Sequence, residues 1–116
     1  MALLSRSYLA QGLAEKALSI LEGRHINLAE HKAYGALLAA AYQASGNYQK
    51  AADTYRILLQ VVPGEGQWLL GFAINSEYLK ADGNAISAYK QALKSGQLTD
   101  ISHQFVTQRL AVLATR

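Results

Sequence analysis

One interval of about 34 residues recurs along this chain and constrains its fold more than any other feature. Ala17, Ala51 and Ala85 are separated by this interval and have similar surroundings. The same interval relates further leucine and aromatic positions: Leu4, Leu38 and Phe72; Leu21, Tyr55 and Tyr89. A period of this length is typical of a repeat built from two antiparallel helices and their turns. The sequence therefore predicts an all-α array in which each unit buries its apolar face only against its neighbours.

Composition agrees with one compact domain and excludes several classes of function. The chain has 116 residues, of which 51% are hydrophobic, and a formal charge of +3 from basic residues that are spread singly. Without a basic cluster, nucleic acid is not an expected partner. The lack of cysteine excludes disulfides and thiolate zinc sites. No apolar run reaches the roughly 18 residues that a membrane span needs, and the start lacks a leader pattern, so no membrane contact is expected.

The turn residues predict three helical hairpins and a capping helix within a single domain, residues 1–116. The repeats are expected at about 1–29, 30–63 and 64–97, and the capping helix at 99–114, with Thr99 or Asp100 as its N-cap. The turns inside the hairpins are expected at Gly12, at Gly46-Asn47 and at Asp82-Gly83-Asn84. The capping helix should cover the last apolar face, as the ends of such arrays require.

Small and aromatic residues at the repeated positions indicate the core. Two helices approach most closely where their side chains are small, and aromatic side chains fill the wider spaces between them. The predicted structural core of the repeats is Ala17, Ala51, Ala85, Tyr42, Tyr55 and Tyr89.

The middle of the chain resembles the tetratricopeptide repeat family. The residues that carry this resemblance are Leu38-Ala39, Tyr42, Gly46-Asn47-Tyr48, Ala51, Tyr55 and Pro63. The third unit keeps Ala85 and Tyr89 but has Lys80 where the turn glycine is usual, and Gly83 follows three residues later. The resemblance implies a superhelix of hairpins with a concave surface that binds other proteins.

A narrower resemblance concerns the segments QWLLGFAINSEYLKADGNAISAYKQALKSGQL and QFVTQRLAVL. They are similar to the C-terminal periplasmic region of biogenesis proteins of the mannose-sensitive haemagglutinin (MSHA) type IV pilus. This resemblance implies a scaffold in pilus assembly, a periplasmic domain of a membrane-anchored protein, and pilus-assembly subunits as partners. If this resemblance is set aside, the alternative is a cytoplasmic location.

The first helix of each hairpin should line the concave groove. The predicted protein-binding residues are Leu3, Arg6, Ala33, Leu37, Ala40, Leu70, Ile74, Glu77, Tyr78 and Phe105. This surface is apolar and suits an amphipathic or extended apolar segment of another protein. A carboxylate clamp is not expected, because alanine, leucine and isoleucine stand where such clamps have Lys, Arg and Asn. Two alternatives remain open: these side chains pack between neighbouring helices, or the surface pairs with a second copy in a homodimer.

No catalytic, metal or cofactor site is predicted. His25, Glu30 and His31 are not spaced as a helix-borne zinc pair, and Gly64-Glu65-Gly66 lacks the length and lysine of a phosphate loop. Trp68 and Tyr78 are interpreted as core or groove residues instead of a stacking platform. The sequence therefore favours a binding or self-association module over an enzyme.

Overall fold

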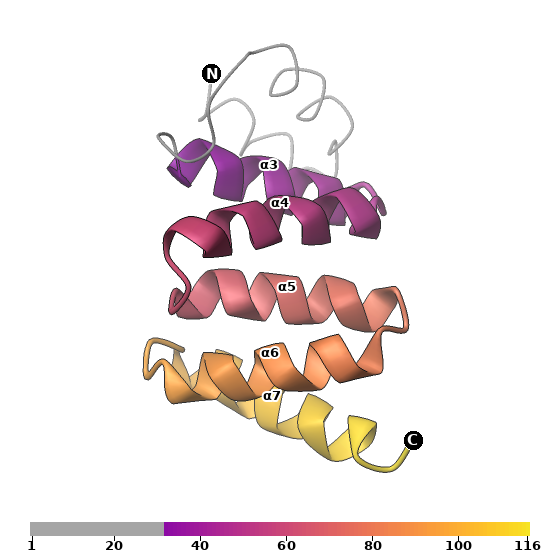
Figure 1. The fold of residues 1–116 in the computed structure, drawn as a ribbon. Coiled ribbons are helices and arrows are strands. Elements are labelled where there is room, and N and C mark those ends of the chain that lie inside the picture. Colours follow the sequence, from indigo (N-terminus) through magenta and orange to yellow (C-terminus); the bar gives the residue numbers. More distant parts are fainter. Residues whose placement is uncertain (1–31) are drawn as a thin grey trace.

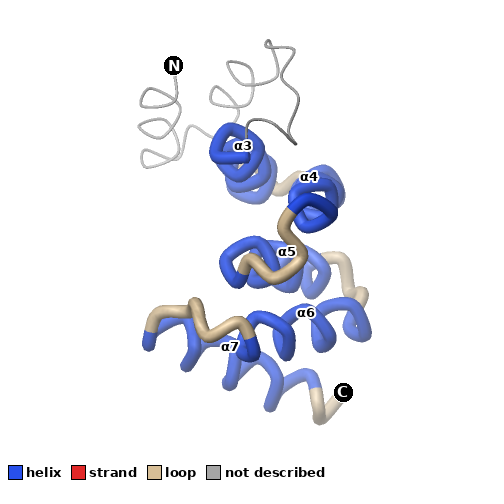
Figure 2. The backbone as a smooth tube through the Cα atoms, turned by 60° about the vertical axis from the view of Figure 1, so that its left-hand side comes forward, coloured by secondary structure: helices blue, strands red, loops and turns tan. Residues whose placement is uncertain are grey.

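The computed structural model describes residues 32–116, and this part of the chain contains five α-helices and no strand. The helices are α3 (Lys32–Ala44), α4 (Tyr48–Val61), α5 (Gly66–Tyr78), α6 (Asp82–Lys94) and α7 (Asp100–Leu113). They lie side by side in chain order and are joined by short turns (Figure 1). Seen from another side, α4 is offset from α3 and α5, which lie on the same side of it (Figure 2). The all-α class and the repeat-like packing are thus confirmed, while the first predicted hairpin lies outside the described residues.

The helix boundaries repeat with the period of the sequence. The first helices of successive units begin at Lys32, Gly66 and Asp100, and the second helices begin at Tyr48 and Asp82, each one repeat period after its predecessor. Because α7 begins in the register of α3 and α5, it takes the place of a first helix, but it contacts α6 less extensively than α5 contacts α4. The predicted capping helix therefore also continues the series of helices that line one side of the array.

Side chains and backbone bonds define most of the helix ends. The Asn47 side chain caps α4 by accepting from Lys50 N at 3.3 Å, and α4 ends at Val61, just before Pro63. At α7, the N-cap is Thr99, one of the two predicted candidates, and its hydroxyl accepts from Ser102 N at 3.2 Å. These side chains satisfy amide groups that have no partner inside their own helix.

The turn of the third hairpin differs from the prediction. It was expected at residues 82–84, but α6 already begins at Asp82 and the chain turns at residues 79–81. Lys80 has φ 61°, close to the φ 86° of Gly46, its equivalent in the preceding hairpin. The turn geometry is therefore retained even though a lysine has replaced the glycine, and Gly83 lies in the first turn of α6.

Small residues at the repeated positions are buried in the core. Ala39, Ala51, Ala73 and Ala85 come from four successive helices, and all four are fully buried. The aromatic residues predicted for the core are buried as well: Tyr42, Tyr55 and Tyr89. Ala17 lies outside the described residues. Alternation of small and large side chains fills the space between helices, as dense cores require.

The core is divided between two neighbouring clusters. One joins α3, α4 and α5 through Ala39, Tyr55 and Leu58, with Trp68 and Phe72 packed against it. The other joins α5, α6 and α7, and its buried members are Ala73, Ala85, Ala88, Tyr89, Val106 and Leu113. Helix α7 adds only Val106 and Leu113 to the buried members of this cluster.

Candidate protein-binding site

An open cavity of about 750 Å³ lies between α5, α6 and α7. Its lining combines aromatic, aliphatic and charged side chains: Ile74, Glu77, Tyr78, Lys80, Asp82, Tyr89, Phe105, Arg109 and Arg116. Four of these were predicted for the groove, namely Ile74, Glu77, Tyr78 and Phe105. The structure therefore brings together the part of the predicted site that comes from α5 and α7.

Helical periodicity explains why these side chains share one surface. On α5, Ile74, Glu77 and Tyr78 are spaced by three and four residues, so they lie on one face of the helix. Phe105 and Arg109 are four residues apart on α7 and face the same cavity. Two stripes of side chains, one on α5 and one on α7, thus line the cavity together with residues of α6.

One substitution within the repeat separates α7 from its neighbour. In the α4–α5 pair, the ring of Tyr55 lies so close to Gly71 that a Cβ there would overlap it. The equivalents one repeat later are Tyr89 and Phe105, whose rings meet edge to face with centroids 6.3 Å apart and an interplanar angle of 72°. A phenyl ring thus stands between α6 and α7 where the preceding pair has a glycine, and α6 and α7 contact each other less extensively than α4 and α5 do.

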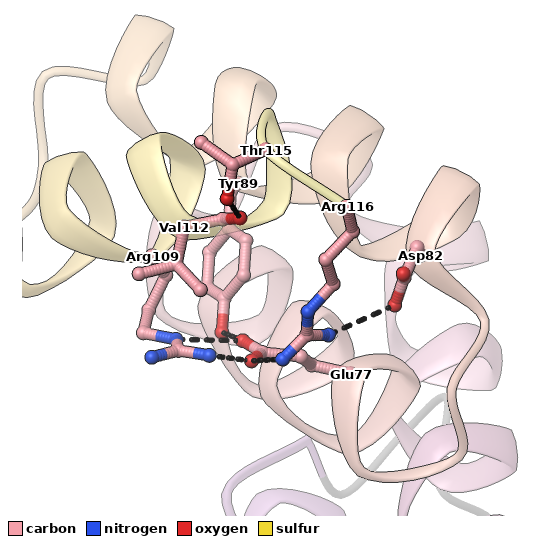
Figure 3. Close-up of polar contacts among 7 residues, drawn as sticks. All are labelled: Glu77, Asp82, Tyr89, Arg109, Val112, Thr115 and Arg116. Atoms are coloured by element: carbon pink, nitrogen blue, oxygen red, sulfur yellow. Dashed lines mark hydrogen bonds and ion pairs between the residues drawn. The ribbon is translucent and has the colours of Figure 1, made fainter.

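Glu77, which lines the cavity, is the centre of a network of polar contacts (Figure 3). Arg109 grips its carboxylate with two nitrogens: Nε donates to Oε1 at 3.0 Å, and Nη2 pairs with Oε2. The Tyr89 hydroxyl donates to Oε1 at 2.9 Å, and Arg116 approaches from the opposite side. Arg116 also pairs with Asp82, with 3.4 Å between Nη1 and Oδ1. Paired guanidinium and carboxylate groups tie α7 to the end of α5 and the start of α6.

The network changes the pKa of its members. The hydrogen bond from Arg109 lowers the pKa of Glu77, and this effect exceeds the opposing effect of burial. Burial raises the pKa of Tyr89 well above its ordinary value, and its hydrogen bond to Glu77 adds to the shift. The hydrogen bond to Glu77 raises the pKa of Arg109 in turn. Near neutral pH the Glu77 carboxylate is therefore ionised and the Tyr89 phenol is neutral, and a hydrogen bond joins the two groups.

Tyr78 is the most accessible aromatic residue of the cavity. The residue is 59% exposed, and its ring stacks on Tyr48 of α4, with ring centroids 4.2 Å apart and planes 5° from parallel. Trp68 is partly buried and packs against the core cluster that joins α3, α4 and α5. The two residues weighed as a stacking platform are therefore not brought together, and Tyr78 presents an aromatic wall to the cavity instead.

The remaining predicted groove residues have different surroundings. Ala33 is exposed, Ala40 is half-buried, and Leu70 is half-buried against the cluster of α5, α6 and α7. Leu37 is only 8% exposed and belongs to the core, so its assignment to an open groove needs correction. For Leu37, packing between helices is the alternative that its burial supports. Leu3 and Arg6 lie outside the described residues.

Sequence reasoning missed four of the five charged residues of the site. Lys80, Asp82, Arg109 and Arg116 all line the cavity, yet none was included in the groove. The register of α7 was the available signal: its predicted start lies one repeat period after the start of α5, and Arg109 lies one turn beyond Phe105. The approach of Arg116 to Glu77 and Asp82 had no such signal, because it depends on how the chain leaves α7.

Residues 32–116 offer no group of three or more His, Asp or Glu side chains that could hold a metal ion. The His25, Glu30 and His31 cluster lies outside the described residues, and His103 is exposed on α7.

No described helix is long and apolar enough to cross a membrane. In comparisons with known proteins, no family and no curated protein matches this chain.

Proposed function

We propose that this chain is a non-catalytic protein-binding module that holds an apolar or amphipathic segment of another protein between α5 and α7. The cavity carries the proposal, because its volume of about 750 Å³ can accept several side chains of a bound segment. Tyr78 and Phe105 provide partly exposed aromatic surfaces of the kind that contribute strongly to protein interfaces. The Glu77 carboxylate, the natural candidate for a base, is held by Arg109, which favours a structural role for it.

The resemblance to pilus-biogenesis proteins determines which partners to test first. We propose a periplasmic location and a scaffolding role in type IV pilus assembly, with pilus-assembly proteins as the binding partners. Both parts of this proposal depend on the resemblance of the α5–α6 segment and of α7, and on nothing in the cavity itself. The binding function stands independently of the pathway.

The experiment compares three baits in an envelope extract of the source organism. The parent chain is compared with Phe105→Gln, which removes an aromatic wall of the cavity, and with Ile57→Gln, which alters a similarly exposed side chain on α4 outside the cavity. We expect the parent and Ile57→Gln to retain the same proteins and Phe105→Gln to lose them, as read by mass spectrometry. Thermal melts of the three baits establish that each is folded. Equal capture by all three baits would contradict the assignment of the cavity as the binding site.

Self-association is the second candidate, and one observation favours it. Ile101, Phe105 and Val112 lie on one face of α7, and Ile101 is 81% exposed. A partly exposed apolar stripe on one face of α7 is a suitable surface for a second copy. Light scattering over a concentration series separates the two proposals: a mass that doubles with concentration in the parent, and not in Ile101→Gln, indicates a dimer through this face.

A further inference from the structure

Lys80 has a backbone conformation that suits glycine better than lysine. Within residues 32–116 it is the only non-glycine residue with positive φ, at 61°. The left-handed region costs free energy for a residue with a Cβ, because the Cβ comes close to the following carbonyl oxygen. In the preceding hairpin the same position is Gly46, which has no such cost.

The turn itself imposes this conformation. Lys80 N donates to Glu77 O and Ala81 N donates to Ser76 O, both at 2.9 Å. The preceding hairpin has the same pair of bonds, from Gly46 N to Gln43 O and from Asn47 N to Tyr42 O. This arrangement closes the end of a helix through one left-handed residue. The fold would therefore accept a glycine at position 80, which adopts this conformation without the cost that a lysine bears.

The position of Lys80 indicates a role for its side chain at the cavity. It lies at the rim of the cavity, next to the exposed Tyr78, and its side chain is exposed. Three lining residues are basic and two are acidic, and the acidic ones are already engaged: Glu77 by Arg109, Asp82 by Arg116. Lys80 forms no ion pair with any residue in the described part of the chain. The cavity thus presents one uncompensated positive charge beside an aromatic wall.

We infer that Lys80 is a specificity residue of the binding site, and that the segment held in the cavity is acidic as well as apolar. An apolar side chain of the segment contacts Tyr78 and Phe105, while an Asp or Glu side chain of the same segment pairs with the Lys80 ammonium. This inference rests on the proposed binding function. A backbone conformation that is unfavourable for lysine is then retained for recognition, as strained residues at functional sites often are.

The test uses three synthetic amphipathic peptides that differ only in charge. Each has leucines at i, i+4 and i+7, blocked ends, and either Glu, Gln or Lys at the flanking positions. Binding to the parent, Lys80→Gly, Lys80→Gln and Lys80→Arg is measured by NMR titration, which also detects weak complexes. We expect the Glu peptide to bind the parent and Lys80→Arg roughly two- to fivefold more tightly than the Gln peptide, the range for an exposed ion pair. In Lys80→Gly and Lys80→Gln this preference disappears.

Stability provides an independent readout. Lys80→Gly should raise the midpoint of thermal unfolding relative to Lys80→Gln, because glycine adopts the left-handed conformation without strain. If Lys80→Gly loses the preference for the Glu peptide and is also more stable, the lost preference cannot result from partial unfolding. In about 0.5 M salt the preference of the parent for the Glu peptide should shrink, since screening weakens exposed ion pairs.

Several results would overturn the inference. The parent could bind the Glu and Gln peptides with equal affinity, or bind the Lys peptide more tightly than the Glu peptide. The preference for the Glu peptide could also survive in Lys80→Gly. Finally, the NMR signals of the cavity residues could fail to shift when the Glu peptide is added. Failure of this inference is distinguishable from failure of the proposed function. If the Gln peptide binds and Phe105→Gln abolishes that binding, the cavity remains the binding site and only the charge preference is wrong.

Discussion

Gly71 and its contact with Tyr55 show how one residue sets the distance between two helices. The Tyr55 ring occupies the space that a side chain at position 71 would need, and the ring is itself buried. Glycine in a helix interior has a conformational cost of about 0.5–1 kcal/mol relative to alanine. The close packing of α4 on α5 must offset this cost.

Replacement of Gly71 by alanine should therefore destabilise the protein, against the intrinsic helix preference. We expect a net loss of about 1–2 kcal/mol, because overpacking against a buried ring outweighs the gain in propensity. Chemical denaturation of the parent and the variant measures the difference. Gly83→Ala is the matched control: Gly83 lies in the first turn of α6 with nothing within 4 Å of an added Cβ, so this variant should be neutral or more stable. A Gly71→Ala protein as stable as Gly83→Ala would contradict the contact.

Glu77 should make stability dependent on pH in the acid range. Its side chain is only 14% exposed, and Arg109 lowers its pKa in the folded state below the ordinary value of 4.5. A carboxyl group with a lowered folded pKa contributes stability that is fully present above its unfolded pKa and is lost as pH falls through the folded pKa. Near neutral pH, Glu77→Gln should thus be less stable than the parent.

The difference in unfolding free energy between the parent and Glu77→Gln should narrow as the pH falls below about 4.5. Denaturant titrations at a series of pH values from neutral to acid provide the measurement. Asp53→Asn is a suitable control, because Asp53 forms its ion pair with Arg56 at an exposed position on α4. A gap between the parent and Glu77→Gln that stays constant with pH would show that Glu77 does not stabilise the fold through its charge.

At the scale of elements, α7 depends on its N-cap more than the internal helices do. It contributes only Val106 and Leu113 to the fully buried core, whereas α4, between α3 and α5, buries side chains against both neighbours. Most helical stability in proteins comes from tertiary packing. A helix with less packing relies correspondingly on local bonds such as the one between Thr99 and Ser102 N.

Thr99→Ala should destabilise α7 by about 1 kcal/mol, because the Ser102 amide loses its acceptor. Thr99→Ser retains the hydroxyl and should remain close to the parent. Thermal unfolding followed by circular dichroism measures both variants. The role assigned to the cap would be contradicted if Thr99→Ala and Thr99→Ser melted together with the parent.

At the scale of the molecule, stability should decrease toward α7. In an array, each helix is held by its neighbours in the chain, and the described contacts join consecutive helices most extensively in the pairs from α3 to α6. The contact between α6 and α7 is less extensive than these, because Phe105 stands where Gly71 permits a close approach between α4 and α5. The side of the cavity formed by α7 is thus also the most easily opened.

Hydrogen exchange should reveal this gradient. We expect backbone amides of α7 to exchange before those of α4, α5 and α6, as the least packed unit opens first. Val106→Ala, which removes buried methyl groups at the contact of α7, should accelerate exchange in α7 and leave α4 almost unchanged. Mass spectrometry of the labelled protein provides the comparison. Simultaneous exchange of all helices would indicate that the described residues open as a single cooperative unit.

The sequence by itself determined the helices and their register, because these depend on local and periodic information. The repeat interval, the glycine and proline positions and the cap at Thr99 agree with the boundaries of α3, α4 and α7. The buried alanines and tyrosines follow from the same periodicity, since a repeated unit places equivalent residues at equivalent contacts. The turn at Lys80 escaped prediction, because a hydrogen-bonded helix end imposed a conformation that the lysine does not favour.

Only the tertiary structure decided where the cavity lies and which charges it contains. Leu37 and Ile74 were both predicted for the groove, but Leu37 is enclosed and Ile74 lines an opening, because exposure depends on what packs next to each helix. The grip of Arg109 on Glu77 joins residues 32 positions apart, and the approach of Arg116 depends on the path of the chain beyond α7. Periodicity predicts which residues share a helix face, whereas the angle and distance between two helices follow from the side chains that meet at their contact.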